Sequence, residues 1–362
     1  MQHQPGLTRA VLVLVCLAAA ALYFARPPPI ERVRALGYTS EQIRDSRFKL
    51  GRANTTRPVR AAFVILARNS ELHELRATVR QLEDQFNVRH GYPYVFLNNE
   101  PFTNGFKQAM EWATSGDCHF GLVPYEHWAE PPWVDRVRAA RARAAMADRV
   151  PYGGSKSYRQ MFESGFFFRH PLLDDFDYYW RVEPGVEFTC NISYDPFRFM
   201  AENNKDYGFT ISLREFPATV HSLWATANAF RATYPEFVAP ANTLRWLTAP
   251  SGDYNMCHFW SNFEIGALSF FRSPEYLAYF DFLDRAGGFF YERWGDAPVH
   301  SIAVAMLLNQ SQVHYFDNIG YYHRPFQNCP TDPDFNSRHC FCNPNRSMIH
   351  HADSCTRAWL DL

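Results

Sequence analysis

Glu183 stands in the segment YYWRVEPGVEFTC, whose pattern predicts a strand that stops beside an acidic residue. Pro184 removes a backbone donor and Gly185 permits a turn, so the strand must end there. A carboxylate at the end of a strand can meet a ligand, and Arg181 is close enough in sequence to balance its charge. A turn held by an Arg–Glu ion pair would explain the same residues equally well.

Glu264 is embedded in a strongly apolar segment, CHFWSNFEIG, beside Phe259, Trp260, Phe263 and Ile265. A carboxylate rarely lies among such side chains without a partner, because burying an unpaired charge is costly. We therefore expect Glu264 to face a cavity where chemistry takes place. A single exposed residue on an amphipathic helix would produce the same pattern.

A third segment, residues 287–325, gathers side chains that could bind a metal ion or a phosphate. Asp296 lies in GGFFYERWGDAPVHS, and His300, His314 and His323 are the histidines of the segment. Imidazole is a common ligand of transition metals, and carboxylates bind divalent cations. Because a lone histidine is more often structural than a ligand, the residues alone do not choose among these four.

The composition is that of an ordinary globular protein, long enough for one large domain or two small ones. The 362 residues are 47% hydrophobic and 20% charged, and the net charge is −1. No basic face is indicated, so nucleic acid is not expected as a partner. Aromatic residues make up 17% of the chain, which suits either a large core or a sugar-binding surface.

An uncharged apolar run occupies residues 10–25, between Arg9 and Arg26. It is shorter than the ~20 residues of a typical spanning helix, although thin membranes of the early secretory pathway accept shorter helices. We predict a membrane-spanning signal anchor, because the run is continuous and a proline-rich stretch follows it. A cleaved signal peptide is the alternative, since small residues lie near the end of the run.

The rest of the chain divides into a linker and one folded domain. Residues 1–9 form a short tail before the anchor, and residues 26–58 are polar and charged, as expected of a stem. No clear boundary divides residues 59–362, which we therefore treat as one catalytic domain.

The cysteines indicate an oxidising compartment, because four of them crowd the C-terminal end of the chain. Such crowding predicts a tail held by disulfides. Zinc is a weaker alternative, since paired C-x2-C units are missing. Of the 8 cysteines, Cys16 lies in the apolar run and the others are Cys118, Cys190, Cys257, Cys329, Cys340, Cys342 and Cys355. Sequons for glycosylation begin at Asn54, Asn191, Asn309 and Asn345.

A strand–helix–strand unit is predicted at the start of the folded domain. Residues 61–67 (AAFVILA) form a continuous apolar run, typical of a strand buried on both faces. A helix follows from about residue 71 to residue 86, with Asn69 or Ser70 as its cap. A second strand is predicted at residues 94–97.

This unit implies a parallel sheet and an α/β fold. In such sheets ligands gather at the carboxyl ends of the strands. We therefore expect ligand contacts in the loop after the first strand, which holds Arg68, and in the loop at residues 98–100. Arg68 is our candidate there for binding a cofactor or donor.

Long runs of this sequence, taken in chain order, match one known family. They are AAFVILARNSEL, YPYVFLNNEPFT, ESGFFFRHPLL, YYWRVEPGV, YDPFRFM, CHFWSNFEIG, GGFFYERWGDAPVHSIA and GYYHRPFQNCP. The chain resembles the fungal Golgi mannosyltransferases of the yeast type, glycosyltransferase family 15. The resemblance covers nearly all of residues 60–330 and is far more specific than a short motif.

The resemblance implies a variation of the GT-A nucleotide-sugar transferase fold, with a mixed, largely parallel central sheet in a single luminal domain. It implies a single-pass type II protein of the Golgi membrane. The activity it implies is transfer of mannose from GDP-mannose to mannose residues of N- or O-linked glycans, with Mn²⁺. Linkages would be mostly α-1,2, with retention of the donor's configuration. The acceptor, and the choice between a covalent intermediate and front-face substitution, stay open.

The resemblance also assigns roles to individual residues. Glu183 stands where other GT-A enzymes have an Asp-x-Asp metal motif, and His323 matches the metal-ligating histidine. Glu264 matches the carboxylate proposed as nucleophile, and Tyr158 matches a tyrosine near that carboxylate and the donor. A divalent cation can neutralise a departing diphosphate, and a carboxylate can oppose positive charge on the sugar. Further polar positions of the donor site are matched by Asp296 and Glu215.

One departure from the family pattern lies beside Tyr158. The family has two further residues, including an Arg, between the positions of Met161 and Phe162. A catalytically weak relative, which binds glycans or scaffolds other Golgi transferases, is therefore the main alternative function. A glycosidase is a second alternative, which would require a paired carboxylate facing Glu264 and no nucleotide.

Overall fold

The computed structural model describes residues 59–150, 158–331 and 338–362. The predicted tail, anchor and stem at residues 1–58 lie outside this part of the chain. Within the described ranges, no helix combines the length and the apolar character needed to cross a membrane.

The predicted strand–helix–strand unit is present. Strand β1 (Ala61–Leu66) is buried along its whole length, helix α4 (Leu72–Gln85) follows, and strand β2 (Tyr94–Asn98) pairs with β1 in parallel. The predicted cap was wrong, because α4 has no side-chain cap hydrogen bond. The side chain of Asn69 instead accepts a hydrogen bond from Thr103 N at 2.9 Å and donates one to Pro101 O at 3.0 Å, which ties two loops together.

The central sheet is mixed and largely parallel, as expected. Seven strands pair in it within the described residues, and β9 alone among them runs antiparallel to both of its neighbours, β4 and β6. This arrangement brings β4, β6 and β9 side by side in the middle of the sheet. The order is β10 (Val313–Tyr315), β6 (Tyr207–Phe209), β9 (Glu264–Ala267), β4 (Tyr178–Arg181), β1, β2 and β3 (Cys118–Leu122).

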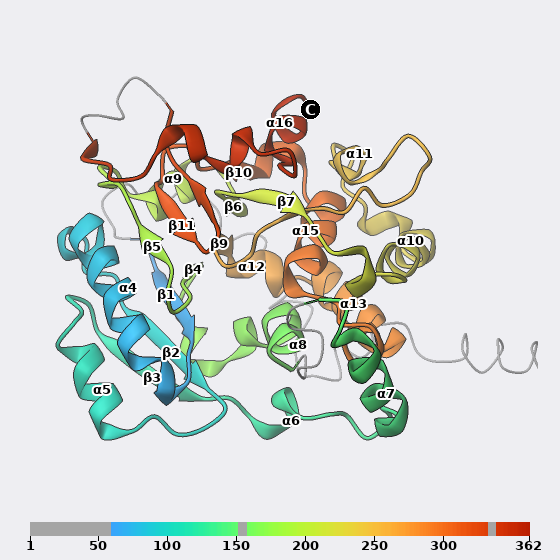
Figure 1. Ribbon diagram of the computed structural model, residues 1–362, viewed down its shortest axis with the longest axis horizontal. Helices are drawn as coiled ribbons and strands as arrows, with labels where there is room; N and C mark the ends of the chain where they lie inside the picture. The colour runs from blue at the N-terminus through green and yellow to red at the C-terminus, as the bar shows by residue number, and fades with distance from the viewer. Residues whose placement is uncertain (1–58, 151–157, 332–337) are drawn as a thin grey trace, which may run out of the picture.

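Helices cover this sheet and extend the molecule along its longest axis (Figure 1). Helices α4 and α5 lie toward the end of the molecule that holds β2 and β3, whereas α10, α13 and α15 lie toward the other end (Figure 1). Helix α15 is buried from Asp296 to Met306, so it forms the core of the end of the molecule that α10 and α13 also occupy. The remaining helices are α5 (Asn104–Glu111), α6 (Tyr125–Trp128), α7 (Arg136–Met146), α8 (Tyr158–Gly165), α9 (Pro196–Glu202), α10 (Leu223–Thr233), α11 (Leu244–Leu247), α12 (Leu268–Phe271), α13 (Pro274–Ala286), α14 (Gly288–Tyr291), α15 (Asp296–Leu307) and α16 (Thr356–Leu360).

Two small antiparallel sheets complete the fold. One has the order β12 (Phe326–Asn328), β11 (Tyr321–His323), β5 (Glu187–Phe188), and the other pairs β7 (Ser212–Arg214) with β8 (Cys257–Phe259). Strand β5 follows directly on the turn after β4, so the first small sheet continues from the carboxyl edge of the central sheet.

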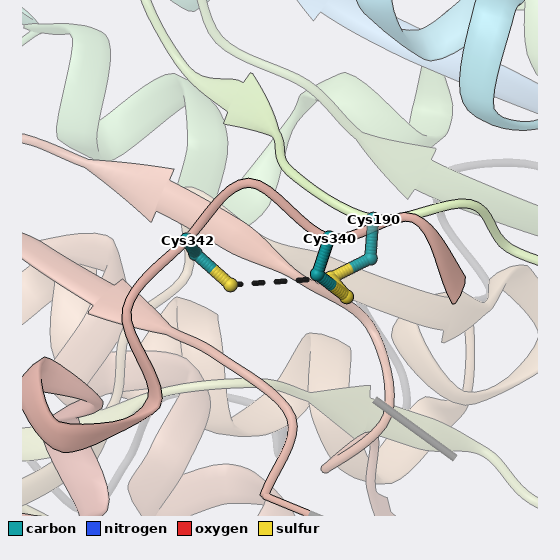
Figure 2. Close-up of side chains that lie close together, drawn as sticks. All are labelled: Cys190, Cys340 and Cys342. Carbon is teal, nitrogen blue, oxygen red and sulfur yellow. Dashed lines mark hydrogen bonds between the residues drawn. A yellow bond between two sulfur atoms is a disulfide. The ribbon is translucent and has the colours of Figure 1, made fainter. Parts of the chain in front are cut away.

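Disulfides hold the C-terminal tail, as predicted from the crowded cysteines. The pairs are Cys190–Cys340, Cys257–Cys355 and Cys329–Cys342, and Cys118 is the free cysteine of the described part. Two of these pairs lie against each other, because Cys342 Sγ is 3.9 Å from Cys190 Sγ (Figure 2). The three neighbouring sulfurs of Cys190, Cys340 and Cys342 are engaged in disulfides, and a metal would require thiolates.

Candidate active site

Arg181, the last residue of β4, is surrounded by carboxyl groups. Its guanidinium contacts Asp296, lies 2.5 Å from Glu183 Oε1 and lies 3.7 Å from Glu163 Oε1. The predicted Arg–Glu pair therefore exists, but it is a buried pair, since the Arg181 side chain is only 7% exposed. We call Arg181, Glu163, Glu183, Asp296 and His323 the Arg181 cluster. One guanidinium facing three carboxyl groups leaves an excess of acidic groups that a divalent cation would balance.

The turn after β4 fixes the position of Glu183. Gly185 has a φ of +84°, a left-handed conformation that glycine adopts without strain. Helix α4 holds the turn through Thr78, whose hydroxyl accepts a hydrogen bond from Gly185 N at 3.1 Å and donates one to Val186 O at 2.8 Å. The sharp turn predicted from Glu-Pro-Gly is thus braced by a helix that precedes it by about a hundred residues.

His323, the last residue of β11, approaches Glu183 from the first small sheet. Its Nε2 lies 3.8 Å from Glu183 Oε2, and its Nδ1 lies 3.1 Å from the carbonyl oxygen of Arg324. Because a carbonyl can only accept, Nδ1 must carry the proton, and in the neutral ring Nε2 presents its lone pair. A histidine whose second nitrogen is held by a backbone carbonyl is the usual arrangement of a metal ligand. The edge of the ring also meets Trp260, with ring centroids 4.7 Å apart.

Asp296 begins helix α15 and closes the other side of the Arg181 cluster. Its Oδ2 accepts hydrogen bonds from Arg181 and from Ser261 Oγ, the latter at 2.6 Å. Burial by itself would raise the pKa of Asp296, but the positive charges of Arg181 and His300 outweigh it and lower the pKa to about 2. Asp296 is therefore a carboxylate throughout the physiological pH range.

Glu264 lies on β9 in the middle of the central sheet and has no exposed surface. Its Oε1 accepts a hydrogen bond from Tyr179 at 2.8 Å, and its Oε2 accepts one from Tyr207 at 3.0 Å. His300 Nδ1 also lies 3.0 Å from Oε2. We call Glu264, Tyr179, Tyr207 and His300 the Glu264 cluster. The amphipathic-helix alternative was wrong, because Glu264 lies on a buried strand, and its partners on neighbouring elements account for a carboxylate in so apolar a segment.

Gly266 explains how Tyr179 reaches Glu264. In the strand register it lies opposite Tyr179 on β4 and opposite Tyr207 on β6. A Cβ at this position would lie 2.6 Å from the ring of Tyr179, so a larger residue would push that ring away. The glycine of the NFEIG motif therefore leaves the space that the Tyr179 ring occupies.

His300, on α15, is held at both ring nitrogens. Nδ1 faces the Glu264 carboxylate, and Nε2 lies 3.1 Å from the backbone carbonyl of Glu163. Because both partners accept hydrogen bonds, the ring is best satisfied when both nitrogens carry protons. Burial opposes that charge, but the carboxylate of Glu264 prevails and raises the pKa of His300. Glu264 and His300 thus form a sealed ion pair.

Glu215 lies near the start of α15, whereas Arg68 lies apart from the Arg181 cluster in the contacts that are observed. Glu215 follows β7, and its Oε2 would lie 3.8 Å from a Cβ at Gly295, the residue before Asp296. Arg68 follows β1 and is exposed at the carboxyl edge of the sheet. There it lines a cavity with room for no more than about one water molecule. The lining residues are Leu66, Ala67, Arg68, Glu71, Asn98, Asn99 and Trp128.

Two further candidates contribute no side-chain geometry to this site. Tyr158 begins helix α8, but its side chain lies outside the described part of the structure. His314 lies on β10 at the far edge of the central sheet, against Phe199 and Phe316. Burial there, together with the charge of Lys205, lowers the pKa of His314 to about 4, as expected for a structural histidine.

Sequence reasoning missed the partners that complete both clusters. Glu163 and Ser261 contact the Arg181 cluster, and Tyr179 and Tyr207 contact Glu264. Glu163 in FESG and Tyr179 in YYWRVEPG lie within the stretches that resemble the family, so that resemblance could have pointed to them as site residues. No spacing rule connects these residues, because they come from elements that are distant in sequence.

The family model described as "Glycolipid 2-alpha-mannosyltransferase" matches residues 37–362. Glycolipid 2-alpha-mannosyltransferase 1 of Candida albicans is 50% identical over 309 residues, which is 84% of this chain and 72% of that protein. An alpha-1,2 mannosyltransferase of Saccharomyces cerevisiae is 49% identical over 308 residues, 84% of this chain and 78% of its own length.

Solved structures agree with these sequence matches. Core-mannan synthase A of Aspergillus fumigatus, in a Mn/GDP form, superposes with a TM-score of 0.79 at 40% identity, over 86% of this chain and 87% of that one. The mannosyltransferase Ktr4p of S. cerevisiae, in complex with GDP, superposes with a TM-score of 0.80 at 36% identity, over 84% of this chain and 82% of that one.

Proposed function

This chain belongs to the glycolipid 2-alpha-mannosyltransferase family, and from that premise we propose that it transfers mannose from GDP-mannose to mannose residues of glycoprotein glycans. The transfer forms α-1,2 linkages with retention of configuration and depends on Mn²⁺. The observation that carries the proposal is the approach of His323 Nε2 to within 3.8 Å of Glu183 Oε2, beside the acidic surroundings of Arg181.

Glu183 and His323 are the residues that would hold the metal ion. One imidazole nitrogen and carboxylate oxygen suit Mn²⁺, which accepts both kinds of ligand. The hydrogen bond between His323 Nδ1 and the Arg324 carbonyl orients the ring for this task. When bound, the cation supplies positive charge for a departing diphosphate.

The nucleotide belongs, in this proposal, at the carboxyl edge of β1 and β2. The loops that hold Arg68, Asn98 and Asn99 lie at this edge, where ligands of open α/β sheets usually bind. The exposed guanidinium of Arg68 is suited to phosphate oxygens, because it offers several donors in one plane. Asp296 and Glu215 are the carboxylates that we assign to polar groups of the bound sugars.

Glu264 acts in this proposal as a fixed negative charge and not as an attacking group. Both of its oxygens already accept hydrogen bonds from Tyr179, Tyr207 and His300, which stabilise the ionised form and lower its nucleophilicity. A buried carboxylate of this kind opposes the positive charge that develops on the sugar during transfer. Tyr158, at the start of α8, remains our candidate for contacting the donor.

We further infer that the enzyme is anchored in the Golgi membrane by residues 10–25, with residues 59–362 in the lumen. The disulfides of the C-terminal tail support an oxidising compartment. Resistance to carbonate extraction and protease protection in sealed vesicles are expected, and a mature N-terminus near residue 26 would contradict the anchor.

The activity is tested by incubating the purified chain with GDP-mannose, other sugar nucleotides and methyl α-mannoside, with and without Mn²⁺. We expect transfer from GDP-mannose that EDTA abolishes and Mn²⁺ restores. NMR of the product should show an α-1,2 linkage. Binding of glycans with no transfer under any condition would instead support the catalytically weak alternative.

A further inference from the structure

A second cavity, of about 610 Å³, lies outside the site described above. Its floor is formed by residues of the sheet of β5, β11 and β12, and its wall by residues of the C-terminal tail. The volume falls within the roughly 300–1,000 Å³ typical of small-molecule sites, which can hold a short oligosaccharide. We call it the tail cavity. The residues that the argument uses are Glu187, Tyr322, Gln327, Phe341, Arg346 and His351.

The floor of the tail cavity carries a row of polar side chains. Tyr322 on β11 lies opposite Glu187 on β5 and opposite Gln327 on β12, so the three share one face of the sheet. Within the described residues, neither the carboxylate of Glu187 nor the hydroxyl of Tyr322 makes a hydrogen bond or ion pair. The partly exposed side chains of Glu187 and Tyr322 are therefore available to a ligand.

Phe341 adds an exposed aromatic ring to the tail cavity, on a segment of backbone that disulfides hold. Phe341 is 60% exposed, although its two chain neighbours, Cys340 and Cys342, are both fixed by disulfides (Figure 2). Its backbone N–H donates to Thr189 O at 3.0 Å, which fastens the wall to the floor. A large apolar side chain held in solvent by a rigid segment is pre-organised for binding, because little entropy is lost when a ligand covers it.

The charges of the tail cavity favour a neutral ligand. Glu187 faces the cavity from the floor, and Arg346 and His351 face it from the tail. A carboxylate in the floor opposes phosphate groups, while the guanidinium opposes a simple cation. Aromatic faces together with carboxylate, amide and guanidinium groups suit a sugar, which has apolar C–H faces and many hydroxyls.

The tail cavity is also adjacent to the candidate metal site. Tyr322 in the floor directly precedes His323, and Phe326, which lines the cavity, lies opposite His323 in the β11–β12 hairpin. Phe326 also contacts Trp260, with ring centroids 5.8 Å apart, and Trp260 contacts His323. Tyr322 and His323 point to opposite faces of β11, so a saccharide that contacts both places must pass the β11–β12 hairpin beside Phe326.

We propose that the tail cavity is a second glycan-binding subsite, which holds neutral mannose units of the acceptor remote from the unit that receives the new sugar. The identity of the sugar rests on the proposed function, whereas the presence of a saccharide subsite rests on the cavity. The subsite gives the enzyme a preference for longer acceptors.

The kinetic test compares methyl α-mannoside with a linear α-mannotetraose as acceptors for the full chain. Phe341→Ala and Glu187→Gln should raise the KM for the tetrasaccharide by about five- to tenfold, as expected for loss of one aromatic or charged contact. The KM for methyl α-mannoside should stay unchanged. Trp112→Ala is the matched control, because Trp112 is a 79% exposed aromatic residue at the end of α5, on a different part of the molecule (Figure 1). Equal KM values in all variants would overturn the proposal.

A binding test separates this proposal from the proposed activity. Without any donor, the full chain should bind mannotetraose in titration calorimetry more tightly than Phe341→Ala or Glu187→Gln does, and maltotetraose should bind weakly. Saccharide binding with no transfer would refute the proposed function but support the subsite. Equal binding by parent and variants, or competition by inorganic phosphate for this site, would overturn the subsite even if transfer is normal. Circular dichroism confirms that each variant is folded.

Discussion

The Arg181 cluster and the Glu264 cluster each contain glutamate and histidine beside a buried cationic group, but they are closed to different degrees. They are neighbours, because Arg181 lies opposite Glu264 in the β4–β9 register. The Glu264 and His300 side chains have no exposed surface, whereas the Arg181 cluster reaches the surface at His323, whose side chain is 30% exposed.

This difference decides what each cluster can do. A sealed pair, with its oxygens and nitrogens already bonded, can hold the sheet together and supply a fixed charge. A cluster with an excess of carboxyl groups and an imidazole near the surface can take up a ligand. The comparison teaches that residue type alone does not separate a binding group from a structural one.

Removing the cation of the Arg181 cluster should have the largest effect. Arg181→Met leaves Glu163, Glu183 and Asp296 without their shared partner, and loss of one member of a buried ion pair typically costs about 3–5 kcal/mol. Urea unfolding should show this loss of stability, with no transfer activity. Arg181→Lys, which keeps the charge, should recover part of the stability. A parental midpoint for Arg181→Met would show that the carboxyl groups do not depend on the guanidinium.

Removing the charge of Glu264 should reduce turnover by ~10²–10³, if the carboxylate opposes positive charge on the sugar. Glu264→Gln should also lower the melting temperature, because it leaves the His300 cation without its buried partner. The double variant Glu264→Gln/His300→Gln should regain stability but not turnover. Recovery of both together would mean that the Glu264 cluster is purely structural, and parental turnover in the single variant would refute its role.

Removing the imidazole of the Arg181 cluster should weaken metal binding and leave the fold intact. His323→Ala should lower the affinity for Mn²⁺ by at least about tenfold, and excess Mn²⁺ should restore part of the activity. Calorimetric titration with Mn²⁺ measures the change. His314→Ala is the matched control, because His314 lies among aromatic rings on β10. Unchanged Mn²⁺ affinity in His323→Ala would show that His323 is not a ligand of the metal ion.

Acid should weaken the Arg181 cluster through Asp296. The pKa of Asp296 is lowered from 3.8 to about 2 in the folded protein, so its contribution is present above about pH 4 and is lost as the pH falls toward 2. The linkage amounts to about 2 kcal/mol of unfolding free energy. Unfolding curves between pH 5 and pH 2 should show it, and Asp296→Asn should reduce the slope. An identical slope in that variant would contradict the assignment.

Alkali should act on the Glu264 cluster, with the smallest effect of the five. The pKa of His300 is raised in the folded state, so its contribution is complete below about pH 6.5 and is lost as the pH rises through the folded-state pKa. Thermal melting of the parent should show a decline above neutral pH that His300→Gln lacks. The same decline in both proteins would place the titrating group elsewhere.

The sequence by itself determined the local elements. The apolar run at residues 61–67 could only be a buried strand, and the Glu-Pro-Gly turn fixed the end of β4 through two residues with special backbone properties. Crowded cysteines likewise predicted the disulfide-held tail. These features depend on neighbours in the chain, and a local pattern records them.

Only the tertiary structure decided which side chains meet. Tyr207 and His300 reach Glu264 across 57 and 36 residues, because β6 lies beside β9 and α15 packs nearby. His323 rather than His314 approaches Glu183, because β11 pairs with β5 directly after the turn. Strand order sets these contacts, and no hydrophobic period encodes strand order. Whether Glu264 was sealed or open therefore depended on the whole sheet.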